Sequence, residues 1–410
     1  MYSSKDLLPY EDALNRTLDN IKELDPARCP LREATGKVLS ESINSKEYSP
    51  NADLSAMDGF AFRWDDLKPN TPIKIQLYNV LGAGDENTKI SVLDHHAVQV
   101  MTGALIPGKL DTVVPIENTR ISNDKESLWI KSFKNLRRGS NVRKCGEDYR
   151  PNDVILKKDT LMTSAHSLLL STLGYDSINV VRRPRIAIIS TGNELVTDYR
   201  ASLKPGQIRN SNYIYLHVVL NSMNLDIVNY SQVKDDPIAI TDYLNKFSMS
   251  ADIIITIGGI SKGLYDYVPA AIDNLGGRFI FQGVAIRPGK PCIHAELPSK
   301  DTNIFCLPGN PIAMMAAFRF IVFPYLRKLS RLPELSTSVA LLKNPVNGKP
   351  PFTRFVLGNC TRSSEKQYVD PIDIQSPSKV SSLSKADSWI IVPPEIKKVS
   401  IGSEIQIMKL

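Results

Sequence analysis

The chain begins with apolar residues at helical spacing. Leu14, Leu18 and Ile21 would share one face of a short amphipathic helix over residues 6–24. A similar pattern predicts a second helix over residues 31–41. Two short helices are therefore expected at the start of the chain.

The stretch from Tyr48 to about Arg150 has a different pattern. It is rich in Pro, Gly, Asn and Asp, and its short apolar runs alternate or carry β-branched residues. Such runs between turn residues are typical of a β domain with long loops. After this stretch, residues 161–173 return to helical spacing and end at Gly174, as expected for a helix terminus.

From Arg185 onward, continuous apolar runs alternate with helical patterns. Residues 186–189 and 253–257 are rich in isoleucine, and residues 311–326 predict a strong helix. Apolar strands that alternate with helices are typical of a parallel sheet covered on both faces. The pattern therefore predicts an α/β domain over about 180–330, followed by the short strands of a small β domain.

Length and composition agree with a multi-domain globular protein. The 410 residues exceed one ordinary domain, and the 42% hydrophobic and 23% charged fractions are near globular averages. The net charge of +7 is only mildly basic. No apolar run is long enough to span a membrane and no export signal is visible, so a cytoplasmic protein is expected. The five cysteines form no CxxC pair, which argues against a disulfide or zinc framework.

Loops rich in small residues follow four of the predicted strands of the α/β domain. Ligands bind beyond the carboxyl ends of strands in such sheets, and glycines let backbone N–H groups approach an anion. Each loop alone could be an ordinary connection between a strand and a helix. The four loops together favour a phosphate or oxyanion site. The candidate binding residues are Ser190, Thr191, Gly192, Gly258, Gly259, Ser261, Arg287, Lys290, Pro308, Gly309, Asn310 and Pro311, with Lys262 as a further cation.

Carboxylates lie near the same predicted strand ends. Glu194 follows the first strand and Asp266 follows the second glycine loop, while Asp235 and Asp236 lie between the two. Each acid alone could be a solvated loop residue. Beside a phosphate site, however, such oxygen ligands suit a bridging divalent cation such as Mg²⁺.

Several other kinds of site are disfavoured by the sequence. No G-x-G-x-x-G follows the first strand of the α/β domain, and neither a P-loop nor a G-x-S-x-G elbow occurs. The neighbouring His95 and His96 would not share a helix face, and His294 alternates with apolar residues, so we expect it to be packed. Arginines are not interleaved with aromatic residues, so nucleic-acid binding has little support.

Nine segments extend in order over most of the chain. They are SAMDGFAF (55–62), MTGALIPGKLDTVVPIE (101–117), GSNVRKCGED (139–148), RPRIAIISTGNELV (183–196), GQIRNSN (206–212), KDDP (234–237), IGGISKGLYDYV (257–268), IRPGKP (286–291) and LPGNPIA (307–313). Together with SPSKVSSLSKADSWIIVP (376–393), they resemble the molybdopterin molybdenumtransferase family of molybdenum-cofactor biosynthesis.

The resemblance implies an activity and an architecture. A member of this family inserts molybdate into adenylylated molybdopterin and releases AMP with the help of a divalent cation. Members form homodimers whose active site draws on both subunits, and the resemblance extends the expected partners to other cofactor-biosynthesis proteins. The implied fold has four domains: an elongated domain from residues 1–45 and 149–180, an inserted β domain over 46–148, the α/β pterin-binding domain over 181–331, and a small C-terminal β domain over 332–410.

The resemblance also assigns roles to residues. Four would act in catalysis: Asp58, Thr102, Glu194 and Asp266. Asp235 would join Asp58, Glu194 and Asp266 in holding the cation. Ser376 and Arg143 would contact substrate. Arg143 lies in residues 131–150, whose seven Lys or Arg against two acids predict a positive wall that steers a phosphorylated substrate.

The chain departs from the family pattern at five positions: Asn193, Asn210, Lys262, Leu264 and Leu357. Because the first three changes make the site more cationic, altered metal affinity or a preference for tungstate is one hypothesis. A pterin-binding carrier without catalysis is the alternative to the enzyme, and a nucleotide hydrolase is a third reading. The SAMDG and MTGA segments argue against the hydrolase, which would not require them.

Overall fold

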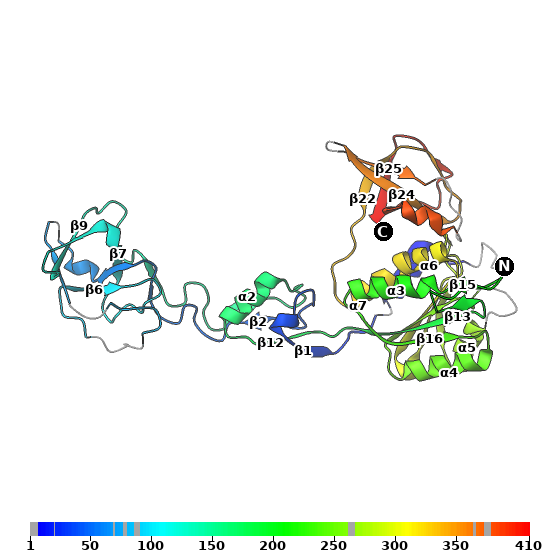
Figure 1. The fold of residues 1–410 in the computed structure, drawn as a ribbon, viewed down its shortest axis with the longest axis horizontal. Helices are drawn as coiled ribbons and strands as arrows, with labels where there is room; N and C mark the ends of the chain where they lie inside the picture. The colour runs from blue at the N-terminus through cyan, green and yellow to red at the C-terminus, as the bar shows by residue number, and fades with distance from the viewer. Residues whose placement is uncertain are drawn as a thin grey trace. The chain divides into compact units, whose positions relative to one another are not determined.

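The computed structural model describes residues 7–19, 21–68, 70–76, 80–85, 91–260, 267–363, 366–372 and 379–410. The chain divides into two compact units (Figure 1). The first unit is Arg28–Asn179, and the second joins Met1–Ala27 to Val180–Leu410. None of the described helices is long and apolar enough to cross a membrane.

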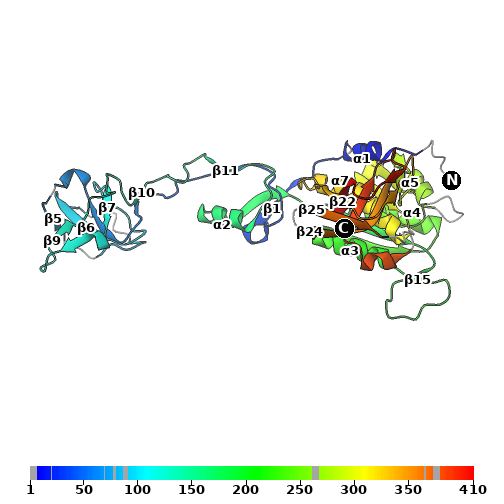
Figure 2. The same cartoon turned by 90° about the horizontal axis from the view of Figure 1, so that it is seen from above.

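The first unit contains the predicted β domain, which is built on a six-stranded sheet. Phe60 and Phe62 of strand β4 pack with Val114 and Leu128 in its core. Figure 2 shows β5, β6, β7 and β9 gathered in this domain. In sheet order the strands are β7 (Thr112–Pro115), β4 (Gly59–Phe62), β6 (His96–Val100), β5 (Ile73–Ile75), β9 (Ser127–Ile130) and β8 (Thr119–Ile121).

The rest of the first unit pairs the segment that precedes the β domain with the segment that follows it. The predicted helix over 31–41 is wrong, because only a 3₁₀ turn, Leu31–Glu33, forms there. The N–H groups of Gly36 and Leu39 donate instead to the carbonyls of Met162 and Thr160. The other elements are α2 (Ser164–Thr172) and the strand pairs β1 (Pro26–Pro30) with β12 (Ser177–Val181) and β2 (Ile43–Asn44) with β11 (Val154–Leu156).

The second unit contains the predicted α/β domain and its six-stranded sheet. Only β20 runs against its neighbours, whereas the other pairings between neighbouring strands are parallel. Because β18 and β21 both pair antiparallel with β20, β18 points the same way as the other strands. The strands before the four candidate loops therefore all end at one edge. In sheet order the strands are β16 (Asp226–Val233), β13 (Arg185–Thr191), β17 (Ile253–Ile257), β21 (Thr302–Leu307), β20 (Ile293–Leu297) and β18 (Arg278–Gln282).

Two apolar layers cover this sheet, as the sequence predicted. Ile186 and Ile188 of β13 belong to one layer, and the intervening Ala187 and Ile189 belong to the other. Alternate residues of a strand face opposite sides, so a continuous apolar run can fill both layers. Figure 1 shows helices on both sides of the sheet. They are α3 (Ser211–Ser222) and α6 (Pro311–Ala317) on one side, and α4 (Pro237–Ser248) and α5 (Val268–Asn274) on the other.

The N-terminal helix α1 (Tyr10–Asp19) packs on this unit beside α7 (Phe323–Leu329) (Figure 2). A π-helical turn, Phe318–Val322, joins α6 to α7. Pro324 explains this turn, because proline has no N–H to donate to the carbonyl of Phe320. The Tyr10 hydroxyl donates to that carbonyl at 3.4 Å. Residues 1–27 thus group with the α/β domain, although the sequence analysis placed them with 149–180.

The C-terminal β domain is a closed barrel. Strand β24 pairs with both β25 and β26, which closes the order β24–β25–β22–β28–β26. Phe355 of β24 stacks on Phe320 with ring centroids 3.6 Å apart, so the barrel packs against the π-helical turn. The strands are β22 (Ser338–Leu342), β24 (Thr353–Ser363), β25 (Lys366–Pro371), β26 (Ser388–Val392) and β28 (Glu404–Lys409).

Two polar clusters stabilise the α/β domain away from the loops. Asp252 accepts hydrogen bonds from Arg182 at 2.6 and 2.9 Å and from the backbone N–H of Arg185 at 2.7 Å. His294 is fully buried, as predicted, and its Nε2 lies 2.9 Å from Oδ1 of Asn303. Burial lowers the pKa of His294 to about 4, so the ring is neutral near pH 7.

Candidate functional site

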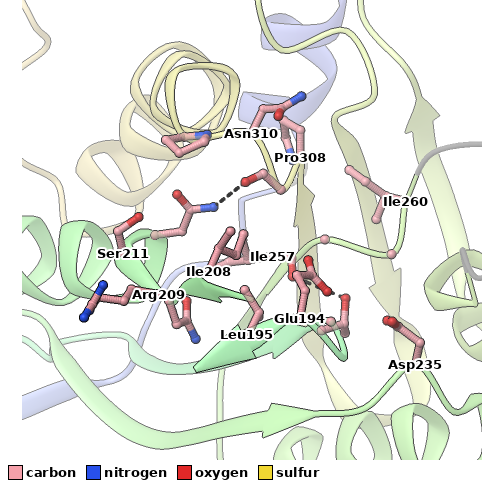
Figure 3. A pocket seen from close by; sticks show the side chains of 18 of the residues that line it. Glu194, Leu195, Ile208, Arg209, Ser211, Asp235, Ile257, Ile260, Pro308 and Asn310 are labelled. Atoms are coloured by element: carbon pink, nitrogen blue, oxygen red, sulfur yellow. Dashed lines mark hydrogen bonds between the residues drawn. The ribbon is translucent and has the colours of Figure 1, made fainter. Parts of the chain in front are cut away.

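A pocket of about 450 Å³ lies where the parallel strands of the α/β domain end (Figure 3). Four segments supply most of its lining, within residues 191–195, 208–212, 257–260 and 308–311. Ten of the residues predicted to bind substrate or metal line it together. They are Thr191, Gly192, Glu194, Asp235, Gly258, Gly259, Pro308, Gly309, Asn310 and Pro311.

The floor of the pocket is bare backbone at Gly258 and Gly259. Their φ angles are +90° and +64°, a region that favours glycine. A Cβ atom at either position would lie 2.9 Å from Oγ1 of Thr191. Side chains are therefore excluded here. The N–H of Gly258 is already engaged, because it donates to the carbonyl of Leu307 at 2.9 Å.

Two carboxylates lie on the same side of the pocket in Figure 3, those of Glu194 and Asp235. Asp235 accepts a hydrogen bond from the backbone N–H of Asn193 at 3.2 Å. Within the described ranges, no three His, Cys, Asp or Glu side chains gather into a set that could hold a metal. Mg²⁺ commonly uses one or two carboxylates and completes its shell with water and substrate phosphate, so this pair fits such an ion.

The opposite wall joins the start of α3 to the loop before α6. Asn210 caps α3, since its side chain accepts from the backbone N–H of Tyr213. Asn212 donates to the carbonyl of Gly309 at 2.7 Å. Arg209 and Ser211 also line this wall.

The predicted site residues did not include Arg209, Ser211 or Asn212. A signal was available, because Asn210 is a good N-cap that precedes an apolar helix in the GQIRNSN segment. A helix that starts at the ligand-binding edge presents its first N–H groups there. The short parallel pair β14 (Leu195–Val196) and β15 (Ile208–Arg209) brings this helix start to the pocket.

Arg287 lies next to an arginine that the sequence analysis missed. The short strand β19 (Ile286–Arg287) pairs with β24 of the barrel, which sets Arg287 opposite Arg354. Burial, and then the charge of Arg287, lower the pKa of Arg354. Neither arginine forms an ion pair with a described acid. Two unneutralised guanidinium groups side by side favour an anionic ligand.

Neither Arg287 nor Lys290 is among the described residues that line the pocket, although the neighbouring Pro291 is. Ser190 is fully buried in β13 and lies behind the lining rather than in it. Three predicted site residues, Ser261, Asp266 and Ser376, lie outside the described residues. The departures at Lys262 and Leu264 lie outside them as well.

In the first unit, Asp58 and Thr102 form one cluster. Asp58 accepts from both the backbone N–H and the hydroxyl of Thr102, each at 2.7 Å. These two hydrogen bonds lower the pKa of Asp58, which keeps the carboxylate charged. The family resemblance implied a catalytic role for both residues without linking them directly.

The basic residues of 131–150 are partly neutralised. Arg143 bonds to Glu147 at 2.8 Å and to Asp148 at 2.7 Å. Arg138 pairs with Asp111, and Lys144 pairs with Asp53. Three of the seven cations that predicted a positive wall are therefore engaged in ion pairs. The positive charge of this wall is therefore smaller than the sequence suggested.

Comparisons with known proteins cover nearly the whole chain. Family models match at residues 8–174 (MoeA N-terminal region, domains I and II), 187–328 (probable molybdopterin binding domain) and 339–410 (MoeA C-terminal region, domain IV). A molybdopterin molybdenumtransferase of Bacillus subtilis is 30% identical over 100% of this chain and 95% of its own length. Another from Nostoc is 33% identical over 81% of this chain and 78% of its own length.

A solved structure supports the same likeness. The molybdopterin biosynthesis MoeA protein of Pyrococcus horikosii is 27% identical, with a TM-score of 0.84. The alignment covers 98% of this chain and 99% of that one. The arrangement of a β domain, a pterin-binding α/β domain and a C-terminal barrel is therefore shared with a known structure.

Proposed function

The chain belongs to the molybdopterin molybdenumtransferase family, and from this premise we propose that it inserts molybdate into adenylylated molybdopterin and releases AMP. The observation that carries the proposal is the pocket at the strand ends. It combines a glycine floor, two carboxylates and the first turn of α3. Such a site suits a ligand that carries phosphate groups and an attached metal ion.

The direct test is an assay of AMP release. Purified protein is mixed with adenylylated molybdopterin and Mg²⁺, and AMP is measured with and without molybdate. We expect release that depends on molybdate. AMP release without such dependence would favour a hydrolase, and binding without release would favour a pterin carrier. Parallel reactions with tungstate would test the preference suggested by Asn193 and Asn210.

Glu194 and Asp235 are the residues that would hold a divalent cation. When bound, the cation would neutralise charge on the phosphoanhydride. The two carboxylates would orient it, and the N–H of Gly259 at the glycine floor would bind a phosphate oxygen. Asp58, held by Thr102, is proposed to take part as the resemblance implies.

Arg287 and Arg354 are proposed to bind an anionic group, with molybdate as the simplest candidate. Replacing Arg354 with methionine keeps much of its length but removes the charge. We expect about tenfold weaker affinity for molybdate, because one charge-assisted contact is lost. The apparent dissociation constant is measured from AMP release against molybdate concentration.

A matched control for this variant lies in the same strand. Arg362 is exposed in β24, away from Arg287 in the register, and R362M removes the same charge. Its molybdate affinity should stay within about twofold of the wild type. Equal behaviour of the two variants would mean that Arg354 has no specific role in molybdate binding.

A homodimer is also proposed, and α3 offers a face for it. On helix α3, Ile214 and Val218 are 41% and 59% exposed, beside exposed polar residues at both ends of the helix. Ile208, just before the helix, is 50% exposed. Exposed apolar side chains grouped in this way favour a surface that another molecule covers, and a second copy of the chain is the occupant we propose.

The dimer proposal predicts an effect for Val218→Glu. A charge within this apolar face should raise the dimer dissociation constant about tenfold, since burying an unpaired carboxylate is unfavourable. The measurement is sedimentation equilibrium over a range of protein concentrations. Val339→Glu, at a position 54% exposed on the barrel, serves as control. A wild type that stays monomeric would contradict the proposal.

The compartment is proposed to be the cytoplasm. All five cysteines are free in the structure, and two of them, Cys292 and Cys306, are fully buried. Burial raises the pKa of Cys306 to about 12, so its thiol stays protonated and unreactive. Free thiols throughout the chain suit a reducing compartment.

A further inference from the structure

One wall of the pocket depends on a buried asparagine whose polar groups are all engaged. Asn210 is only 2% exposed. Its backbone N–H donates to Val196 at 3.1 Å, and its Oδ1 accepts from the N–H of Tyr213. These two bonds tie the strand β14 to the first turn of α3, which presents Ser211 and Asn212 to the pocket.

Two tyrosine hydroxyl groups complete the contacts of Asn210. The hydroxyl of Tyr199 donates to its backbone carbonyl at 2.9 Å, and its Nδ2 donates to the hydroxyl of Tyr230 at 2.9 Å. The tyrosines come from separate segments, since Tyr199 follows β14 and Tyr230 lies in β16. Neither tyrosine is among the described residues that line the pocket.

The bond to Tyr230 has a specific consequence for the cap. An asparagine amide has an acceptor end and a donor end of similar shape, and only the acceptor end can cap a helix. The N–H of Tyr213 can only donate, so Oδ1 faces it, and the Tyr230 hydroxyl then accepts from the donor end, which would otherwise be buried without this partner. Tyr213 also stacks on Tyr230, with ring centroids 3.7 Å apart, which holds the Tyr230 ring in place.

We propose that Tyr199 and Tyr230 are positioning residues for substrate binding: through Asn210 they fix the first turn of α3, and hence Ser211 and Asn212, in the geometry that binds substrate. The inference rests on the proposed function of this pocket. Asn212 extends the effect, because it donates to Gly309 and so couples the turn to the loop before α6.

The test compares Tyr230→Phe with Tyr213→Phe. Both changes remove one hydroxyl and keep the ring, but the Tyr213 hydroxyl faces His217 at 3.5 Å rather than Asn210. AMP binding is measured by calorimetry, and the rate of AMP release is measured at saturating substrate. We expect Tyr230→Phe to weaken AMP binding about tenfold and to change the saturated rate less than twofold. Tyr213→Phe should stay within twofold in both.

Repeating the Tyr230→Phe change in a protein that carries Asn210→Ser separates a positioning role of Tyr230 from general destabilisation. Serine also caps helices but has no amide N–H that needs a partner. In a protein that carries Asn210→Ser, adding Tyr230→Phe should therefore change AMP affinity less than twofold. An equally large loss in both backgrounds would overturn the proposal, as would a Tyr230→Phe protein with a lower melting temperature but normal AMP affinity.

The outcomes also distinguish this inference from the proposed activity. A wild type that binds AMP but shows no molybdate-dependent release would contradict the activity, while the comparison of AMP affinities would still decide the role of Tyr230. A wild type that does not bind AMP would overturn both proposals.

Discussion

Replacing Glu194 with glutamine is expected to lower molybdate-dependent AMP release on the order of 100-fold, because it removes one of two described carboxylates proposed to hold the cation. Glutamine keeps the size and one oxygen but not the charge. The loss should shrink as Mg²⁺ is raised, since weaker binding can be offset by concentration. The measurement is the rate of AMP release over a Mg²⁺ titration.

Asp242→Asn is the control for this experiment. Asp242 is an exposed acid of α4, in the same domain but outside the pocket lining. Its rate and Mg²⁺ dependence should match those of the wild type. If E194Q released AMP at the wild-type rate at every Mg²⁺ concentration, Glu194 would have no part in holding the cation or in the reaction.

Replacing Asp252 with asparagine is expected to lower the free energy of unfolding by about 3 kcal/mol, as for other broken buried ion pairs. The side chain of Asp252 is 14% exposed and bonds to Arg182 and Arg185. Its backbone carbonyl accepts from Asn303, so this residue joins the starts of β13, β17 and β21. The measurement is urea unfolding of both proteins at pH 7.

The ion pairs of Asp252 with Arg182 and Arg185 also predict how the stability difference between the two proteins depends on pH. Burial alone would raise the pKa of Asp252, but hydrogen bonds from Arg182 and Arg185 outweigh it and lower the pKa to about 2. A carboxyl with a lowered pKa stabilises the fold above its unfolded pKa of 3.8 and loses that contribution as the pH falls toward 2. The difference between the two proteins should therefore shrink below about pH 4.

Asp226→Asn serves as the comparison for this stability prediction. Asp226 lies 3.7 Å from Arg183, with 59% of its side chain exposed. Exposed pairs contribute about 0–1 kcal/mol, so this change should be nearly neutral. If the two variants unfolded at the same urea concentration, the burial of the Asp252 pair would not account for its effect.

The α/β domain could be predicted from the sequence because its strands carry a local signal. The run Ile186–Ile189 is apolar at every position, which requires a sheet covered on both faces. The helix predicted over 31–41 failed for a nonlocal reason. Its backbone groups pair with the segment near Met162, more than 100 residues away, and no local pattern contains that pairing.

The residues of the candidate site also divide into those that a local sequence pattern predicts and those that it does not. Gly258, Gly259 and Asn310 could be found because each lies within three residues of the end of an apolar strand. Arg354 could not, since it meets Arg287 only through the pairing of β19 with β24. Ser190 shows the opposite error, because it was predicted to begin the loop after the strand but lies buried inside the strand.

The bond between Tyr10 and the π-helical turn sets an order of events during synthesis. Its two partners are 310 residues apart in the chain. At about 5–20 residues per second, the N-terminal helix leaves the ribosome roughly 15–60 s before Phe320 is made. The whole of Arg28–Asn179 emerges in that interval and can fold first. The amino terminus therefore has to stay available, and a nascent chain that lost it could not complete its larger unit.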